Sequence, residues 1–463
     1  MRASKTWVVA MVLATFFAAI YADALGHGFV KDDFRWIAAA EIHSAADLQR
    51  VFKSNVGFYR PIVTLSFAID RALWGLDARG YAATNLLLLL ADAGLLFVLA
   101  RRLSLPPAAS LFAVATWMFN FYGINMALLW ISGRTALLLC LFSMSAILAW
   151  LRGSRLATAF LTCAAMFCKE EAVVLPLLLL LLGVVAANEY SSNARRALRQ
   201  SWPLWAVAAL YLVIRTQSGA FGVSDAPAYY RLTVDPRLVL RNAAEYLDRG
   251  ATWPAVAALL LFLFTRGTSL DNDERRVIRF GVVWFVSMLG ITVFLPVRSS
   301  LYAVAPSIGS ALAAGSFASR AQRAAPQRFA HVSTALIVAA AALIPVYRMR
   351  NQGLVEPADL STQAIAELRR AAQRRPDIRE IVLVDDGGAA VTLEDAFGGL
   401  TPEAVRLFVS PDVLVRTSDA AGPVDPAKED VMVFRLRDGR LVQDTVRVRT
   451  NGSPADTSAA QPG

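Results

Sequence analysis

Long apolar runs recur along the first three quarters of the chain and then stop. A helix needs about 20 predominantly apolar residues to cross the hydrocarbon core of a bilayer, and several of these runs approach that length. The first run has no convincing small-residue cleavage site, so we interpret it as an uncleaved span. We expect eleven transmembrane helices, near residues 7–26, 81–100, 106–122, 134–151, 156–168, 172–187, 202–217, 251–265, 280–297, 301–317 and 331–347.

Beyond Arg348 the pattern changes to that of a small soluble domain. Apolar spacing predicts a helix over 357–376, and the run 380–384 predicts a buried strand. Two alternating segments around Asp438-Gly439 predict a hairpin. The predicted fold class is therefore an all-α polytopic membrane protein of about 11 transmembrane helices with a small α/β domain. The predicted ranges are 1–347 for the membrane domain, 348–450 for the α/β domain and 451–463 for a disordered tail.

Basic residues fall at alternate connections between the apolar runs, as the positive-inside rule requires. They are Arg2 and Lys5, Arg101 and Arg102, Arg152 and Arg155, Arg195, Arg196 and Arg199, Arg266, Arg275, Arg276 and Arg279, and Arg320, Arg323 and Arg328. We therefore expect a multi-pass protein of the cell inner (plasma) membrane with a cytoplasmic N-terminus. The loop 27–80, the segment 218–250 and the C-terminal domain are then extracytoplasmic, and membrane lipids are direct partners.

Composition supports this interpretation. The chain is 56% hydrophobic and 18% charged, where soluble proteins have about a quarter charged residues. The net charge of +10 is spread over the connections, and no basic stripe interleaved with aromatics is present, so nucleic-acid binding is not expected. The three cysteines show no zinc-ligand spacing, and His27 and His43 fit no ligand pattern, so no metal site is predicted from them.

The loop 27–80 holds two adjacent carboxylates, Asp32 and Asp33, directly after the first span. One carboxylate can take a proton from an acceptor hydroxyl, and apolar surroundings favour this by raising its pKa. The other can position the acceptor or bind a divalent cation such as Mg²⁺ or Mn²⁺, so a cation requirement is left open. The alternative is structural, because either aspartate can cap a helix that starts at Phe34. Farther along the loop, an apolar helix from about residue 62 to 74 carries charges and is expected to lie on the membrane.

A set of short motifs follows in a characteristic order. They are Asp32-Asp33-Phe34, Tyr59-Arg60-Pro61-Ile62, Leu73-Trp74-Gly75-Leu76, Gly80-Tyr81 to Asn85-Leu86-Leu87, Trp130-Ile131-Ser132-Gly133-Arg134, Cys168-Lys169-Glu170-Glu171 and Pro296-Val297-Arg298-Ser299-Ser300-Leu301-Tyr302. This order, over residues 7–347, resembles the GT-C glycosyltransferases. The resemblance is to the protein O-mannosyltransferase-like members, including the transmembrane proteins with tetratricopeptide repeats.

The resemblance implies a glycosyltransferase that uses a polyprenyl-phosphate-linked sugar as donor, with an acceptor that the sequence does not identify. By analogy Asp33, or its neighbour Asp32, is the catalytic carboxylate. The basic residues at matching positions, Arg134, Lys169 and Arg298, are implied to bind the donor phosphate. The remaining motif residues Glu170, Arg60 and Tyr302 are implied to position substrate.

Other interpretations of the same residues stay open. Lys169 and the glutamates beside it can pair with each other in a turn, and Arg298 can extend to the membrane interface. Thr135-Ala136 follow Arg134 where the family often has an acidic residue, which favours a catalytically inactive scaffold of the same fold. A transporter is the third alternative, although no internal repeat is visible.

Overall fold

The computed structural model describes residues 2–53, 57–185, 190–222, 226–264, 269–385, 388–418 and 431–444. The chain divides into two compact units, Met1–Ala358 and Asp359–Gly463. The domain boundary predicted after residue 347 lies inside helix α16 (Ile344–Arg374), which begins in the first unit and ends in the second. The predicted tail, 451–463, lies outside the described residues.

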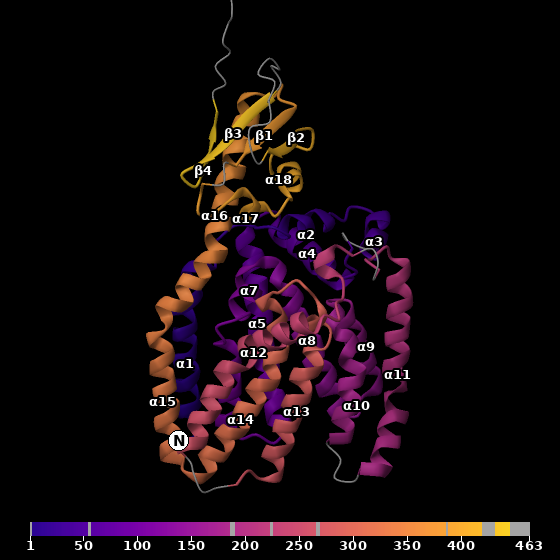
Figure 1. Cartoon of the computed structure of the whole chain (residues 1–463), viewed down its shortest axis with the longest axis vertical. Helices are drawn as coiled ribbons and strands as arrows, with labels where there is room; N and C mark the ends of the chain where they lie inside the picture. Colours follow the sequence, from indigo (N-terminus) through magenta and orange to yellow (C-terminus); the bar gives the residue numbers. More distant parts are fainter. Residues whose placement is uncertain are drawn as a thin grey trace, which may run out of the picture. The chain divides into compact units, whose positions relative to one another are not determined.

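The first unit is a bundle of helices that run side by side, with further helices and turns in the connections between them (Figure 1). The bundle helices are α1 (Arg2–Tyr21), α5 (Ala78–Arg102), α6 (Pro107–Met118), α8 (Arg134–Leu151), α9 (Arg155–Met166), α10 (Leu175–Val185), α11 (Tyr190–Gln217), α12 (Pro236–Phe264), α13 (Asn272–Leu289), α14 (Pro306–Ala324) and α15 (Pro326–Ala342). The connections hold the helices α2 (Asp33–Ala39), α3 (Ala45–Val51), α4 (Pro61–Trp74) and α7 (Ile124–Leu129) and the 3-10 turns η1 (Ala22–Ala24), η2 (Ile131–Gly133), η3 (Glu170–Val174), η4 (Ala228–Tyr230), η5 (Thr292–Phe294) and η6 (Ser300–Ala303).

Each of the eleven predicted apolar ranges is helical over most of its length. Within the described residues, four helical segments are long and apolar enough to cross a membrane, and a fifth span results if the bent pair α15 and α16 counts as one. The four are Ala78–Arg102, Ile131–Leu151, Pro236–Phe264 and Asn272–Phe294. The predicted all-α membrane fold is confirmed, and the number of eleven spans stays a prediction.

Helices α2, α3 and α4 of the loop 27–80 gather at one end of the bundle (Figure 1). Pro61 begins α4, where a missing N–H costs nothing. This helix buries Val63 and Phe67 but exposes Leu73 and Trp74, as expected of a helix at a membrane surface. Its position on the membrane stays a prediction.

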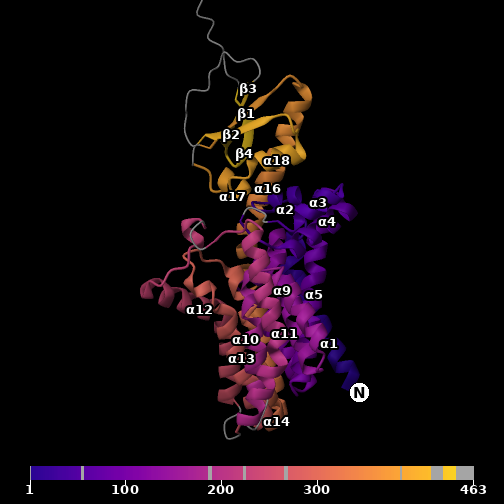
Figure 2. The ribbon, with the colours of Figure 1, turned by 90° about the vertical axis from the view of Figure 1, so that its right-hand side faces the viewer.

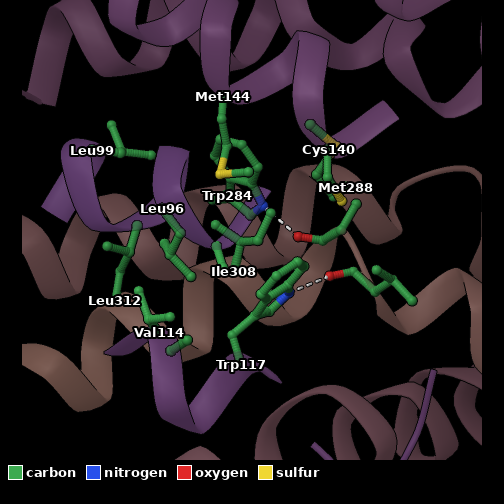
Figure 3. Close-up of a cluster of buried hydrophobic side chains, with 14 of the residues drawn as sticks. Leu96, Leu99, Val114, Trp117, Cys140, Met144, Trp284, Met288, Ile308 and Leu312 are labelled. Carbon is green, nitrogen blue, oxygen red and sulfur yellow. Dashed lines mark hydrogen bonds between the residues drawn. The ribbon is translucent and has the colours of Figure 1, made fainter. Parts of the chain in front are cut away.

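The core of the bundle is apolar and contains two indole N–H groups that need acceptors (Figure 3). Trp117 of α6 donates to the carbonyl oxygen of Val304 at 3.1 Å, and Trp284 of α13 donates to that of Ala305 at 2.6 Å. Pro306 then starts α14. The two indoles therefore fix the entry of α14 against α6 and α13.

Helices α13 and α14 pack backbone to backbone at a pair of glycines. A Cβ atom added to Gly281 would lie 2.3 Å from the carbonyl oxygen of Gly309, and one added to Gly309 would lie 2.2 Å from that of Gly281. Neither position accepts a side chain without separating the helices. Viewed at 90°, α12 and α13 stand on the side of the bundle opposite α1 and α5 (Figure 2).

The second unit is a small α/β domain, as predicted. Its strands are β1 (Glu380–Val384), β2 (Leu414–Ser418), β3 (Val431–Arg437) and β4 (Arg440–Gln443), and its helices include α17 (Leu393–Phe397) and α18 (Thr401–Phe408). The sheet order is β2-β1-β3-β4, with β1 parallel to both neighbours and β3 antiparallel to β4. The hairpin turns at Asp438-Gly439, where both residues have positive φ, 48° and 70°.

The glycine contact gives a testable prediction. Gly281→Ala should destabilise the protein by about 1–3 kcal/mol, because the added methyl group has no space against α14. The matched control is Gly94→Ala on α5, where nothing lies within 4 Å and the better helix former should stabilise by up to about 1 kcal/mol. Thermal unfolding of the purified protein in detergent measures both, and equal midpoints would show that the glycine contact is not close.

Candidate functional site

The two adjacent aspartates at the start of α2 have different environments. Asp33 is fully buried and accepts three hydrogen bonds, from the Val30 N–H at 2.9 Å, the Ser132 N–H at 2.7 Å and the Ser132 hydroxyl. Asp32 occupies the N-cap position, but its exposed side chain makes no capping bond. The residue before it, Lys31, has a φ of 50°. The backbone therefore turns Asp33 into the protein and leaves Asp32 at the surface.

Asp33 is anchored by the turn that connects α7 to α8. A Cβ on Gly133 would lie 2.4 Å from the carbonyl oxygen of Met126, so only glycine fits this turn. The side-chain amide of Asn85 on α5 approaches four carbonyl oxygens at 3.1–3.4 Å, those of Ala127, Leu128, Trp130 and Ile131. Asn85 thus holds in place the segment from which Ser132 reaches Asp33.

Desolvation raises the pKa of both aspartates. For Asp33 the pKa rises to about 7, with the hydrogen bonds from Ser132 and the backbone opposing the effect. For Asp32, desolvation by the surrounding protein raises the pKa, and three nearby cations, Arg35, Arg60 and Lys31, oppose it. A carboxylate with a raised pKa is a stronger base, which suits proton transfer near neutral pH.

Arg60 and Glu170 form a forked ion pair beside the aspartates. The Arg60 Nε and Nη2 atoms donate to Glu170 at distances of 2.6–3.3 Å, and the guanidinium lies 4.3 Å from the ring centroid of Phe58. Burial alone would raise the pKa of Glu170, but the Arg60 charge outweighs it and holds the pKa below its ordinary value. Arg60, before α4, and Glu170, in η3, are thereby fixed together.

Lys169 lies next to this pair. Its Nζ atom is 2.7 Å from the Glu171 carboxylate and 4.6 Å from the ring centroid of Tyr302. Tyr302 also interacts electrostatically with Arg60. The structure therefore brings Lys169 and Tyr302 to the same place as Arg60.

Tyr230, in the segment between α11 and α12, faces the same groups. It interacts electrostatically with Arg60, Asp32 and Glu170, and burial raises its pKa to about 12. Its ring packs edge-on against Phe58, with centroids 5.2 Å apart. Part of the predicted outside segment thus packs beside Asp32.

The predicted site residues therefore separate into a cluster and two arginines that are engaged elsewhere. The cluster contains Asp32, Arg60, Lys169, Glu170 and Tyr302, and Asp33 is the chain neighbour of Asp32. The two arginines are Arg134 and Arg298. Sequence reasoning missed two contributors. Ser132 stands inside a quoted motif but gave no separate signal, and nothing in the sequence distinguishes Tyr230 from other loop tyrosines. The pair of Lys169 with Glu171 is one that the turn interpretation predicted.

Arg134 is enclosed rather than available at this site. It is fully buried, lies 2.6 Å from Asp70 in an ion pair, and donates to the Asn85 side chain at 3.0 Å and the Tyr81 carbonyl at 3.2 Å. The Phe67 ring covers it, with its centroid 4.2 Å away. A donor phosphate would have to displace Asp70, so the geometry favours an architectural role over the predicted phosphate contact.

Arg298 is engaged with α12. It pairs with Glu245, which also pairs with Arg241 at 3.0 Å and Arg249 at 3.2 Å. One carboxylate is thus shared by three guanidinium groups. Arg298 is about one-third exposed, so it stays a candidate for an anion contact. Tyr302, which contacts Lys169, packs against Tyr246 of α12 with the two ring centroids 6.2 Å apart.

An apolar groove of about 590 Å³ lies between α12, α13 and α14. It is lined by small and aromatic side chains, among them Ala251, Ala255 and Phe285. Phe285 also packs in a cluster with Tyr246, against which Tyr302 packs. Phe285, which lines the groove, thus belongs to the aromatic cluster against which Tyr302 packs. Within the described residues no group of three or more histidine, cysteine, aspartate or glutamate side chains is arranged to hold a metal ion.

The fold defines the class of protein. The chain matches the crystal structure of ArnT from Cupriavidus metallidurans bound to undecaprenyl phosphate, with a TM-score of 0.52 and 15% sequence identity over 95% of this chain and 98% of that chain. It is a membrane protein with the GT-C fold.

Sequence similarity indicates a narrower relationship. The chain is 29% identical over 178 residues to the protein O-mannosyl-transferase Tmtc1 of Drosophila melanogaster. The match covers 34% of this chain and 21% of that protein, and no family model matches the chain. The chain thus has the GT-C fold and resembles the protein O-mannosyltransferases, which confirms the resemblance expected from the motifs.

The buried ion pair gives a second prediction. Arg134→Met should destabilise the protein by about 3–5 kcal/mol, because it leaves the Asp70 charge buried and unpaired. The double variant Asp70→Leu/Arg134→Met should lose less than the sum of the single variants. Arg79→Met, an exposed arginine at the start of α5, is the control and should stay within about 0.5 kcal/mol of the wild type. Thermal unfolding in detergent decides, and additive losses would contradict the coupling.

Proposed function

We propose that the chain transfers a sugar from a polyprenyl-phosphate-linked donor to an extracytoplasmic acceptor. The observation that carries the proposal is the environment of Asp32. Its carboxylate is exposed, makes no capping bond and interacts with Arg60, while its neighbour Asp33 is anchored inside the protein. Such an arrangement presents one carboxylate to substrate from a fixed backbone.

Asp32 is then the general base. It accepts the proton of the acceptor hydroxyl as that oxygen attacks the anomeric carbon of the sugar. The bond between this carbon and the phosphate oxygen breaks, and the electron pair leaves with the lipid phosphate. Direct displacement of this kind inverts the configuration of the sugar carbon.

The leaving phosphate needs positive charge where its own charge develops. Arg60 and Lys169 supply it in this proposal, with Tyr302 against Lys169. Glu170 and Glu171 hold the two cations in place before substrate binds. A phosphate can share a forked guanidinium with a carboxylate, because Arg presents five N–H donors.

A lipid-linked donor is supported by three observations. The candidate site lies on a membrane protein, an apolar groove shares Phe285 with the aromatic cluster against which Tyr302 packs, and the similar structure of ArnT was solved with undecaprenyl phosphate. The alternation of basic connections supports a plasma-membrane protein with the loop 27–80 and the C-terminal domain outside the cytoplasm. The acceptor is a protein, lipid or polysaccharide.

The test is sugar transfer by membranes that carry the wild type or Asp32→Asn, supplied with a panel of polyprenyl-phosphate sugars. Asp32→Asn should lower kcat by about 10²–10⁴-fold, the usual contribution of a general base, and leave thermal stability unchanged because the side chain is exposed. Asp33→Asn should lower both, because Asp33 anchors the backbone. Asp23→Asn, at a carboxylate that is 83% exposed, is the matched control.

Full transfer by Asp32→Asn would contradict the assignment of the base. Absence of transfer by the wild type with every donor and with total membrane acceptors would favour the inactive-scaffold alternative. Repeating the assay with a chelator and with added Mg²⁺ or Mn²⁺ measures any requirement for a divalent cation.

A further inference from the structure

Ser132 is a buried residue that contacts Asp33 from a distant part of the chain. It is 3% exposed, and it gives Asp33 both its backbone N–H, at 2.7 Å, and its hydroxyl hydrogen. Both donors reach the same carboxylate oxygen, while the Val30 N–H takes the other one. The contact spans 99 positions of sequence, so it joins α2 to the start of α8.

The two donors fix more than the position of one side chain. Asp33 is the first residue of α2, and the backbone N–H groups of Asp33 and Phe34 bond to the carbonyls of Val30 and Lys31 in the preceding turn. Lys31 has the left-handed φ of 50°, a conformation that a non-glycine residue keeps only when its surroundings hold it. The clamp on Asp33 therefore determines where the carboxylate of Asp32 points.

Ser132 is itself held rigidly. It lies between Ile131, whose carbonyl oxygen accepts from the Asn85 amide at 3.1 Å, and Gly133, which packs against the α7 backbone. Two residues later, Arg134 is locked by Asp70. Because this turn is held on both sides, the Ser132 hydroxyl is already oriented before the reaction. A catalytic group can be held in its reactive geometry at low entropic cost in this way.

We propose that Ser132 is a positioning residue for sugar transfer: its hydroxyl and N–H clamp Asp33 and thereby aim the carboxylate of Asp32 at the acceptor hydroxyl. Ser132 does not touch substrate in this arrangement. The inference rests on the proposed function for its kinetic consequence, and on the hydrogen-bond geometry alone for the clamp.

The test measures kcat and the donor KM per folded protein for a series of Ser132 variants. Ser132→Ala should lower kcat by about 10- to 100-fold, the range expected when a hydrogen bond to a charged group is lost, with the donor KM unchanged. Ser132→Cys fills nearly the same volume but donates weakly, so it should resemble Ser132→Ala. Ser132→Thr keeps the hydroxyl and should retain most of the wild-type kcat.

Ser143→Ala is the matched control. Ser143 is a fully buried serine of α8 whose hydroxyl has no hydrogen-bond partner among the described residues. Its replacement should leave kcat unchanged. The combination of Ser132→Ala with Asp33→Asn should be no slower than Asp33→Asn alone, because the clamp acts through Asp33.

Three results would overturn the inference. An unchanged kcat in Ser132→Ala and Ser132→Cys, with lower thermal stability, would make the contact structural only. A raised donor KM at constant kcat would make Ser132 a binding residue. If the wild type transfers no sugar, the proposed function fails. A thermal double-variant cycle that still couples Ser132 to Asp33 would then assign the clamp to folding alone.

Discussion

The ion pair between Asp70 and Arg134 is the interaction on which the candidate site depends. Neither side chain is more than 2% exposed, and taking two charges out of water is offset only when the geometry is good and the remaining donors are satisfied. Asn85 and the Tyr81 carbonyl take further N–H groups of Arg134, and Phe67 covers its face. The pair thus joins α4 and α5 to the first residue of α8, directly after the turn that carries Ser132 and, through it, anchors Asp33.

The charged groups of the candidate site are arranged differently from this fully buried pair. Arg60 pairs with Glu170, and Lys169 pairs with Glu171. Each of the two cations also lies over an aromatic ring. Asp32 makes no capping hydrogen bond and interacts electrostatically with the Arg60 guanidinium. A site with held cations and one less constrained carboxylate is polarised before substrate arrives, so little reorganisation is needed when charge moves toward a leaving phosphate.

Much of this could be predicted from the sequence. Apolar length placed the helices, and the alternation around Asp438-Gly439 placed the hairpin. The order of the motifs brought Arg60, Lys169, Glu170 and Tyr302 together, because connections on one side of a bundle meet at the same end. The division of roles between Asp32 and Asp33 was not predictable. Which of two adjacent side chains at a helix start points into the protein depends on the backbone before them, here on the positive φ of Lys31. Nor was the enclosure of Arg134 predictable, because its partner Asp70 lies 64 positions away, in the helix that the sequence predicts to lie on the membrane.

This division has a consequence for how such a site can change in evolution. In the proposed function, a substitution at Asp32 or Tyr230 alters groups beside the reacting atoms and leaves the buried network of Asp70, Asn85 and Arg134 intact. A substitution at Ser132 or Arg134 disturbs orientation and stability at once, because Ser132 lies in the turn whose carbonyls accept from Asn85 and Arg134 donates to the Asn85 side chain. The candidate site can therefore change at Asp32 and Tyr230 while this buried network stays. The chain keeps the fold of ArnT at 15% identity, which is possible because the apolar side chains of a bundle core can be exchanged when their total volume and pattern are kept.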